Sequence, residues 1–474
     1  ALCGLSFSLV FGAAEGIAAP PLRWNGPANG VWDATTPNWL DAGNNTVAWI
    51  PGAEAIFEGA GGLIEIAADV SAVDLTFTGN GYTLLGAGRL CVEGTLTTAV
   101  ATTNCIVADL CTVDGLTKDG PGVLALARCA GPVNVQGGSL LAAGSFFADV
   151  EITVAAGASL VTLGEPDSGA NLIANGSFET PELASGTWTY KVPAEWTMVY
   201  QYYVGQQNTA SVAGYSNPWN AADTAPDGVQ MLILQYGGAV AQTVTVPTDG
   251  LYSVALSYLM RNNNREHQVY LTLDGIPLAT LFNRRLQTAP DRFVSGALWL
   301  AAGSHTLGIS GEHGWGDRST MVDAVCFAAP SDAQPCRALG GDSVLKVVNA
   351  ANVVMEHTGT APLAYVAIND TAASGTFDSS HASGIFSGNG ALSCSAPANV
   401  YTWSGVGSWS DAARWTDGAA PAAGGGQDLL IRFPSATGAA AANDLAGEFL
   451  ARGIAASGLA DGDIATLSGG TVVL

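Results

Sequence analysis

The stretch Gly115–Ala143, GLTKDGPGVLALARCAGPVNVQGGSLLAA, carries the pattern that decides the fold. Its apolar residues form short runs, and most of these runs are closed by glycine, which adopts the backbone conformations of tight corners. Similar short segments fill residues 63–162, spaced roughly seven to twelve residues apart. This pattern predicts the stacked rungs of a β-solenoid.

A second kind of strand begins after the segment GEPDSGANLIANGSFETPEL, residues 164–183. The strands become longer, and those in YSVALSYLM (residues 252–260) and VYLTLDG (residues 269–275) alternate apolar with polar residues. Such alternation indicates a sheet with one buried and one solvated face, as in a β-sandwich. Rung-like strands resume after MVDAVCFAAPSDAQPC (residues 321–336), so the predicted fold is all-β, with β-solenoid stretches flanking a β-sandwich jelly roll.

A tryptophan-rich unit occurs twice. Trp24, Trp32 and Trp39 are echoed by Trp403, Trp409 and Trp415, with Gly, Asn or Ser beside them in both copies. Recurrence within a structural unit favours packing at a solenoid cap over recognition. The second copy stops earlier than the first, which suggests an incomplete sequence.

The chain therefore divides into five predicted segments. The apolar start, ALCGLSFSLVFGAAEGIAAP, has the length and the small residues of a signal peptide, without an initiator Met or a basic n-region. We expect an exported protein, secreted, extracellular or on the outer surface of a bacterium. The segments are a partial signal peptide (1–19), a Trp-rich cap with solenoid repeats (20–168), the jelly roll (170–328), a solenoid continuation (340–398), and a second cap with a truncated solenoid (401–474).

Charge excludes one class of partner. The chain has 40 acidic and 16 basic residues, a formal net charge of −24. It would repel phosphate backbones and anionic lipid surfaces, so we expect no nucleic-acid binding. No segment after the signal peptide has an uninterrupted apolar run of membrane-spanning length. The oligomeric state does not follow from the sequence.

The eight cysteines leave the disulfides open. No CxxC spacing is present, which argues against a zinc or iron–sulfur site. Cys105 lies close to Cys111 in sequence, and Cys326 to Cys336, so either pair is a candidate disulfide in an oxidising compartment.

The solenoid pattern resembles the autotransporter-associated β-strand repeat of bacterial passenger proteins. That family has a Leu-Thr-Lys-x-Gly-x-Gly-x-Leu core followed by a strand and Gly-Gly-x-Leu. The matching positions here are Leu116, Thr117, Lys118, Gly120, Gly122, Leu124, Gly137, Gly138 and Leu140, with Val123 in place of the usual Thr. The resemblance implies an architecture rather than an activity.

The middle segment resembles the galactose-binding-like jelly rolls used as carbohydrate-binding modules. NLIANGSFETP opens it, LAAGSHTLGISG lies near its end, and MVDAVCF closes it. In that superfamily the first and last strands often share a structural Ca²⁺ ion. The resemblance implies Glu179 and Asp323 as its ligands, with backbone carbonyls around Asn175 and Ser177, although the family's paired acids are reduced here to Asp323 alone.

A glycan-binding role requires exposed aromatic rings surrounded by amides and charges. The predicted ligand-binding residues lie in the expected loops of the jelly roll, where the same aromatics could alternatively fill the core. They are Trp196, Tyr203, Trp219, Arg261, Arg265, His267 and Trp315.

Catalysis has little support in the sequence. None of the five histidines lies in HExxH, and neither a GxSxG elbow nor a phosphate-binding P-loop occurs. We therefore expect a non-catalytic glycan-binding or adhesion protein. The alternatives are a purely structural surface or matrix protein, and a polysaccharide-active β-solenoid enzyme, which would need two carboxylates facing one groove.

Overall fold

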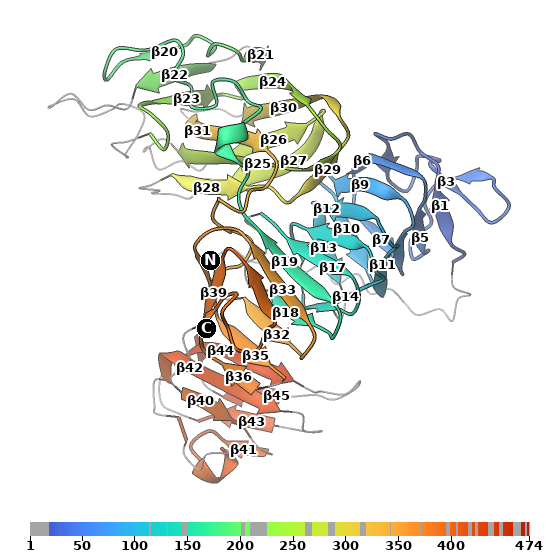
Figure 1. The fold of residues 1–474 in the computed structure, drawn as a ribbon, viewed down its shortest axis with the longest axis vertical. Coiled ribbons are helices and arrows are strands. Elements are labelled where there is room, and N and C mark those ends of the chain that lie inside the picture. Colours follow the sequence, from blue (N-terminus) through green and yellow to red (C-terminus); the bar gives the residue numbers. More distant parts are fainter. Residues whose placement is uncertain are drawn as a thin grey trace. The chain divides into compact units, whose positions relative to one another are not determined.

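The computed structural model consists almost entirely of β-strands (Figure 1). In the described residues the only helical elements are the 3-10 turns η1 (Ser168–Ala170) and η2 (Ala412–Arg414), which confirms the all-β prediction. The predicted signal peptide lies outside the described residues, apart from its last position. The structure describes all residues except 1–18, 113–114, 130, 145–149, 201–203, 209–224, 261–267, 283–289, 313–318, 342, 370, 395–398, 404–405, 416–419, 422–424, 435–439, 445–448, 458–465, 470–471 and 474.

The chain forms two compact units. The first contains residues 1–372 and 376–393, and the second contains residues 373–375 and 394–474. Within the first unit, short parallel strands stack into a solenoid, and the antiparallel sheets of a sandwich form a separate body (Figure 1).

Two long sheets form the main faces of the solenoid. The twelve-stranded sheet has the order β36 (Thr371–Ala373), β35 (Tyr365–Ile368), β32 (Val344–Val347), β18 (Glu151–Val154), β16 (Val133–Val135), β14 (Leu116–Asp119), β11 (Thr95–Thr98), β8 (Leu75–Phe77), β5 (Ala55–Phe57), β1 (Leu22–Trp24), β3 (Trp39–Leu40) and β4 (Thr46–Val47). The nine-stranded sheet has the order β2 (Val31–Trp32), β6 (Ala60–Ile66), β9 (Asn80–Leu85), β12 (Thr103–Ile106), β15 (Val123–Leu126), β17 (Ser139–Ala142), β19 (Ser159–Leu163), β33 (Asn352–Glu356) and β38 (Phe386–Gly388).

Two three-stranded sheets complete the rungs. One has the order β13 (Asp109–Thr112), β10 (Arg89–Val92) and β7 (Val70–Ala72), and the other has the order β34 (Thr360–Leu363), β39 (Ala391–Cys394) and β37 (Gly375–Phe377).

The solenoid continues in register across the inserted domain. Strand β18 pairs in parallel with β32, and β19 pairs with β33 from Ser159↔Asn352 to Leu163↔Glu356. The jelly roll therefore enters between two consecutive rungs without interrupting either main sheet, which is the flanking arrangement expected from the sequence.

The three-stranded sheet β13-β10-β7 carries the disulfide. Cys91 of β10 and Cys111 of β13 are partners in the parallel ladder, and their sulfur atoms are bonded. The suggested Cys105–Cys111 pairing is therefore wrong, because Cys105 lies buried on a different sheet with a free thiol. Cys326 and Cys336 are also free.

Beside this disulfide, opposite charges alternate from rung to rung. Asp69 pairs with Arg89 at 2.7 Å, and Asp109 on the next rung pairs with Arg128. Parallel in-register stacking brings side chains about 20 residues apart into contact, and the 20-residue separation of Cys91 and Cys111 has the same origin.

Lys118 occupies an inward position of the solenoid core. Its neighbours in the parallel register are Leu96 and Val135, both buried, and Lys118 is itself 0% exposed. Its Nζ donates hydrogen bonds to the carbonyls of Asp119 (3.1 Å), Gly120 (2.7 Å), Gly122 (3.0 Å) and Gly137 (2.8 Å). The ammonium group thus joins the corners of two adjacent rungs, a structural role for the lysine of the repeat pattern.

The tryptophans of the two caps are buried. Trp24 contacts Trp39 edge-on with ring centroids 5.2 Å apart, and Trp32 packs on Trp49 and Phe57. In the second unit, Trp403 contacts Trp415 edge-on at 5.0 Å, and Trp409 is 0% exposed. The prediction of a packing role for both sets is confirmed.

The inserted domain is a sandwich of two mainly antiparallel sheets. The seven-stranded sheet has the order β20 (Trp188–Thr189), β22 (Val204–Asn208), β23 (Gln230–Gln235), β31 (Ser319–Ala328), β25 (Gly250–Met260) and β28 (Asp291–Val294), with β29 (Leu298–Leu300) also paired to β25. The five-stranded sheet has the order β21 (Thr197–Tyr200), β24 (Ala239–Val246), β30 (Gly303–Gly311), β26 (Gln268–Leu273) and β27 (Ile276–Phe282). Buried residues of both sheets, among them Leu232, Val254, Val269 and Ile309, form one core.

The second unit contains two parallel sheets. They have the orders β40 (Asn399–Thr402), β42 (Gly425–Pro434), β44 (Phe449–Ser457), β46 (Val472–Val473), and β41 (Val406–Ser408), β43 (Ala440–Asn443), β45 (Thr466–Gly469). Repeated parallel pairing of this kind again indicates solenoid rungs.

Candidate functional site

Most of the predicted glycan-binding residues lie outside the described residues. This applies to Tyr203, Trp219, Arg261, Arg265, His267 and Trp315. Their roles stay predictions.

Trp196 is described, and its predicted role is corrected. The indole is 6% exposed and packs on Phe178 with ring centroids 5.4 Å apart. Its Nε1 donates to the carbonyl of Asn175 at 3.1 Å. With one ring face in the core and its polar atom already bonded, Trp196 cannot serve as an exposed sugar platform.

A different aromatic pair is exposed at the edge of the seven-stranded sheet. Trp188 lies in edge strand β20, and Tyr190 is the first residue after that strand. Trp188 is 45% exposed and Tyr190 is 39% exposed. The two rings are in edge-to-face contact with centroids 4.9 Å apart. We call this pair the edge aromatics. They combine partly exposed aromatic surface with a defined mutual geometry.

The edge aromatics are anchored to the sheet through an amide. The hydroxyl of Tyr190 donates to Oε1 of Gln235 at 2.9 Å, and Gln235 is 3% exposed at the end of β23. A buried partner holds the tyrosine ring in place before any ligand arrives, which lowers the entropic cost of binding. The alternation in Trp188-Thr189-Tyr190 could have shown the pair, because residues two apart share a strand face.

Asp323 and Glu179, the two side chains predicted to hold Ca²⁺, lie near one another beside the middle of β31. The carboxylate of Asp323 is 0% exposed; its Oδ2 accepts from the backbone amide of Asp227 at 2.8 Å, and its Oδ1 accepts from that of Ala324 at 2.6 Å. Glu179 Oε1 accepts from the amides of Val229 (2.8 Å) and Gln230 (2.6 Å). Both carboxylates therefore fasten the segment that leads into β23.

Burial shifts the pKa of the Asp323 carboxyl group. Desolvation raises the pKa of Asp323 to about 8, and the neighbouring charges of Asp227 and Glu179 act in the same direction, against the two amide hydrogen bonds. A divalent cation would relieve that repulsion and keep the carboxylate ionised.

Asn175 and Ser177, predicted to offer backbone carbonyls to the ion, differ in whether those carbonyls already accept hydrogen bonds. The Asn175 carbonyl already accepts from Phe178 N (3.2 Å) and Trp196 Nε1 (3.1 Å), which occupies both of its lone pairs. Its side chain bonds the backbone of Thr180 and Ala194. Asn175 therefore shapes the turn, whereas the carbonyl of Ser177 accepts no hydrogen bond from the described residues.

Asp323 and Glu179 offer the type of ligand atom that a hard cation binds, but they are only two side chains. Asp323 and Glu179 offer oxygen only, as Ca²⁺ prefers. Among the described residues, however, no group of three or more His, Cys, Asp or Glu side chains is close enough to hold a metal ion. Backbone carbonyls and water would have to complete the shell, and Ca²⁺ binding stays a prediction.

Comparison with known proteins finds no matching family model and no matching curated protein. Among solved structures, the chain is similar to TmCBM61 in complex with β-1,4-galactotriose (15% identity, 34% of this chain and 98% of that chain, TM-score 0.24). It is similar to a family 35 carbohydrate binding module from Clostridium thermocellum (14% identity, 30% and 98% covered, TM-score 0.21). A third similar structure is the enzymatically active domain of Bacteriophage CBA120 tailspike protein 4 (10% identity, 58% and 53% covered, TM-score 0.23).

Proposed function

We propose that the inserted jelly roll binds carbohydrate through the edge aromatics, and that the protein is a non-catalytic glycan-binding protein of the bacterial exterior. The observation that carries this proposal is the exposed Trp188–Tyr190 pair, held by the buried Gln235. Sugar rings stack their C–H faces on such aromatics.

An extracellular location is part of the proposal. The Cys91–Cys111 disulfide joins neighbouring rungs, and structural disulfides persist in oxidising compartments. No helix in the described part of the chain is long and apolar enough to cross a membrane. Ca²⁺ is proposed as a structural ion at Asp323 and Glu179, where it would neutralise the carboxylates that fasten the loop before β23.

The test is a titration of the full chain with soluble β-1,4-galactan, xylan and mannan oligosaccharides. In Trp188→Ala we expect affinity for a bound oligosaccharide to fall about tenfold or more, because the stacking surface is lost. Tyr190→Phe keeps the ring and removes the bond to Gln235, so the loss should be only a few-fold.

Phe282→Ala is the matched control, since Phe282 is an exposed aromatic (63%) on β27 of the other sheet. Unchanged affinity in Trp188→Ala would contradict the proposed platform. If the folded chain bound no member of the panel, a purely structural role would replace glycan binding.

A further inference from the structure

The jelly roll is packed directly against the solenoid. Trp299 of β29 exchanges two hydrogen bonds with Thr83 of β9: its amide donates to Oγ1 at 2.9 Å, and its carbonyl accepts from Oγ1 at 3.0 Å. A Cβ on Gly296 would lie 2.3 Å from the Cβ of Ala127, so the jelly-roll backbone at Gly296 packs closely on Ala127 of the solenoid. The junction is therefore a close-packed interface rather than a flexible tether.

An apolar column on the outer face of the nine-stranded sheet seals this junction. Cys105, Ala125 and Leu141 are in-register partners on consecutive rungs, and they pack with Ala297 and the ring of Trp299. In addition, Leu63, Leu85, Val107 and Ala127 of the solenoid belong to the same buried cluster as the core of the sandwich. Any hollow left at this interface has fixed walls.

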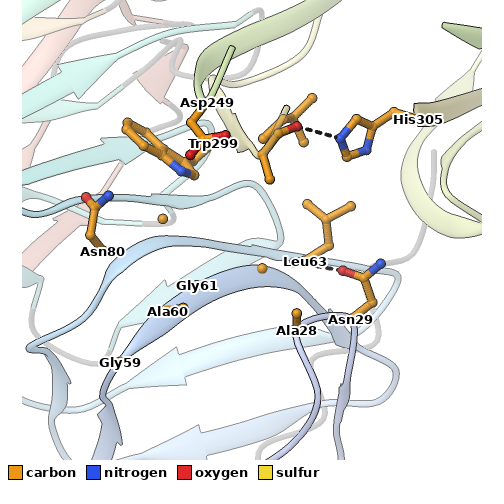
Figure 2. A pocket seen from close by; sticks show the side chains of 14 residues that line it. Ala28, Asn29, Gly59, Ala60, Gly61, Leu63, Asn80, Asp249, Trp299 and His305 are labelled. Atoms are coloured by element: carbon orange, nitrogen blue, oxygen red, sulfur yellow. Dashed lines mark hydrogen bonds between the residues drawn. The ribbon is translucent and has the colours of Figure 1, made fainter. Parts of the chain in front are cut away.

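Such a hollow of about 390 Å³ lies at the edge of the junction (Figure 2). Its solenoid wall includes Asn29, Asn80 and the glycines around Gly61 and Gly81, and its jelly-roll wall includes Asp249, Trp299 and His305. The volume falls within the roughly 300–1,000 Å³ of small-molecule sites. We call it the junction cavity.

Its floor is backbone rather than side chain. A Cβ on Gly61 would lie 2.0 Å from the carbonyl carbon of Gly81, and one on Gly81 would lie 2.6 Å from Trp299 Nε1. Gly81 also has a φ of +87°, which disfavours any other residue. The two glycines therefore let the neighbouring rung and the indole of Trp299 pack directly on the strand backbone, which shapes this wall of the cavity.

Three polar side chains of the junction cavity each accept a hydrogen bond through one atom and have a second polar atom that is not bonded within the described part of the chain. Asn80 Oδ1 accepts from Thr103 N at 2.7 Å, and Asp249 Oδ1 accepts from Ala302 N at 2.7 Å. Asn29 Oδ1 is 3.4 Å from Leu63 N. The amide nitrogens of Asn29 and Asn80 and the second oxygen of Asp249 have no hydrogen-bond partner in the described part of the chain. Figure 2 shows these side chains around the opening with Trp299.

His305 has a positioning role in this wall. Its Nδ1 lies 2.7 Å from Asp274 Oδ2 and its Nε2 2.9 Å from the carbonyl of Ala301, so both ring nitrogens are engaged. The ring thereby holds Ala301 in place. The next residue, Ala302, donates its backbone N–H to Asp249. The group left to face a ligand is one carboxylate among amide and indole donors.

We infer that the junction cavity is a second saccharide site, which binds one or two units of a neutral sugar and is independent of the edge aromatics. The amide donors of Asn29 and Asn80, on either side of the cavity, and the carboxylate of Asp249 can bond sugar hydroxyls, and the indole of Trp299 offers an apolar contact. The carboxylate and the net charge of −24 disfavour uronic acids and sulfated sugars. Both domains contribute, so neither could form the site alone.

The test uses the full chain with Trp188→Ala, so that the edge aromatics do not contribute. The probes are galactotriose, xylotriose and mannotriose, with trigalacturonate as the anionic counterpart, titrated by calorimetry. We expect one neutral trisaccharide to bind with a stoichiometry of one per chain, and trigalacturonate not to bind.

Two further substitutions locate that binding. Asp249→Asn retains an oxygen for Ala302 but removes the charge, and Ala28→Trp places a large ring at the rim; each should weaken binding about tenfold or more. Glu93→Gln, an exposed acid elsewhere on the solenoid, is the matched control and should have no effect.

The outcomes separate the two proposals. Binding that survives both cavity substitutions, preferential binding of trigalacturonate, or a folded Trp188→Ala chain that binds none of the trisaccharides would each overturn the junction site. If Asp249→Asn abolishes binding in the wild-type background while Trp188→Ala does not change it, the junction site stands and the edge aromatics fail.

Discussion

The solenoid and the jelly roll each bury an ionisable side chain, Lys118 and Asp323, in different surroundings. In the solenoid, the buried cation Lys118 is enclosed by four carbonyls of its own and the adjacent rung. Asn104, 0% exposed, likewise donates to Gly79 O and accepts from Tyr82 N. In the jelly roll, Asp323 is equally buried but has neighbouring acids and no cationic partner among the described residues, and Trp188 has a ring open to solvent.

This difference follows from the geometry of each body. Parallel stacking repeats the same corner every rung, so a group such as Lys118 always finds carbonyls of an adjacent turn. A sandwich has unique loops and edge strands, which do not offer the same set of carbonyls at every turn. We therefore expect the solenoid to respond to mutation through stability, and the jelly roll to respond mainly through ligands.

The largest effect should come from Lys118→Met. The substitution keeps an unbranched apolar stem but leaves buried carbonyls of the Gly120, Gly122 and Gly137 corners without a donor. We expect the free energy of unfolding to fall by about 3–5 kcal/mol. Urea denaturation followed by circular dichroism would measure it.

Lys346→Met is the matched control within the same sheet. Lys346 on β32 forms a partly exposed ion pair with Glu151, at 2.5 Å, on the outer side of the solenoid. Exposed pairs of this kind contribute about 0–1 kcal/mol. If both substitutions cost the same, the carbonyl cage around Lys118 would not be the stabilising feature.

The next largest effect should come from opening the Cys91–Cys111 disulfide. It closes a sequence separation of 20 residues, and a crosslink of that span stabilises by about 3 kcal/mol through the entropy of the unfolded chain. Thermal unfolding with and without reductant would show the loss. The Cys91→Ser/Cys111→Ser double variant should match the reduced protein and be insensitive to reductant; a reductant effect that persists in it would assign the loss to another bond.

The stability of the jelly roll should depend on pH through Asp323. Its pKa is raised from 3.8 to about 8, so the folded chain retains a proton that the unfolded chain releases between these values. The resulting stabilisation is full below about pH 4 and is lost as pH rises through 8, by roughly 1.4 kcal/mol per pH unit between these values. Thermal midpoints at pH 5 and pH 8, in EDTA, would detect it.

The effect of calcium on stability should depend on the ionisation of the same Asp323 carboxyl group. If the ion binds the ionised carboxylate, it should raise the midpoint more at pH 8 than at pH 5, because at pH 5 it competes with a proton. Asp323→Asn should remove both the pH dependence and the calcium effect. An equal calcium effect in wild type and Asp323→Asn would place the ion elsewhere.

How far the sequence predicted the molecule depended on repetition. Glycine-closed strands and the two tryptophan sets occur more than once, so the solenoid and the cap packing could be read from the pattern. The disulfide joins positions one rung apart, because a 20-residue rung places Cys91 and Cys111 in register. Sequence proximity favoured Cys105 instead, but Cys105 lies on another face.

The candidate sites could be predicted only where sequence neighbours are also neighbours in space. The Trp188–Tyr190 pair is such a case, since one intervening residue separates them on one strand face. The junction cavity is not, because Gly81 and Trp299 are more than 200 residues apart and meet only when the sandwich docks on the solenoid. Trp196 gave the opposite error, since its residue type suggested a platform while its contacts with Phe178 and Asn175 make it core.

The smallest effect on stability should come from Trp188→Ala. The ring is nearly half exposed on an edge strand, so its removal should change the free energy of unfolding by less than about 0.5 kcal/mol. Denaturation of this variant beside Phe282→Ala, with oligosaccharide titrations of the same preparations, would measure both properties. A loss of stability well above that of Phe282→Ala would mean that the edge aromatics hold the sheet together. Little change in stability with weakened sugar binding is the combination expected of a residue that contributes to ligand binding rather than to the stability of the sheet.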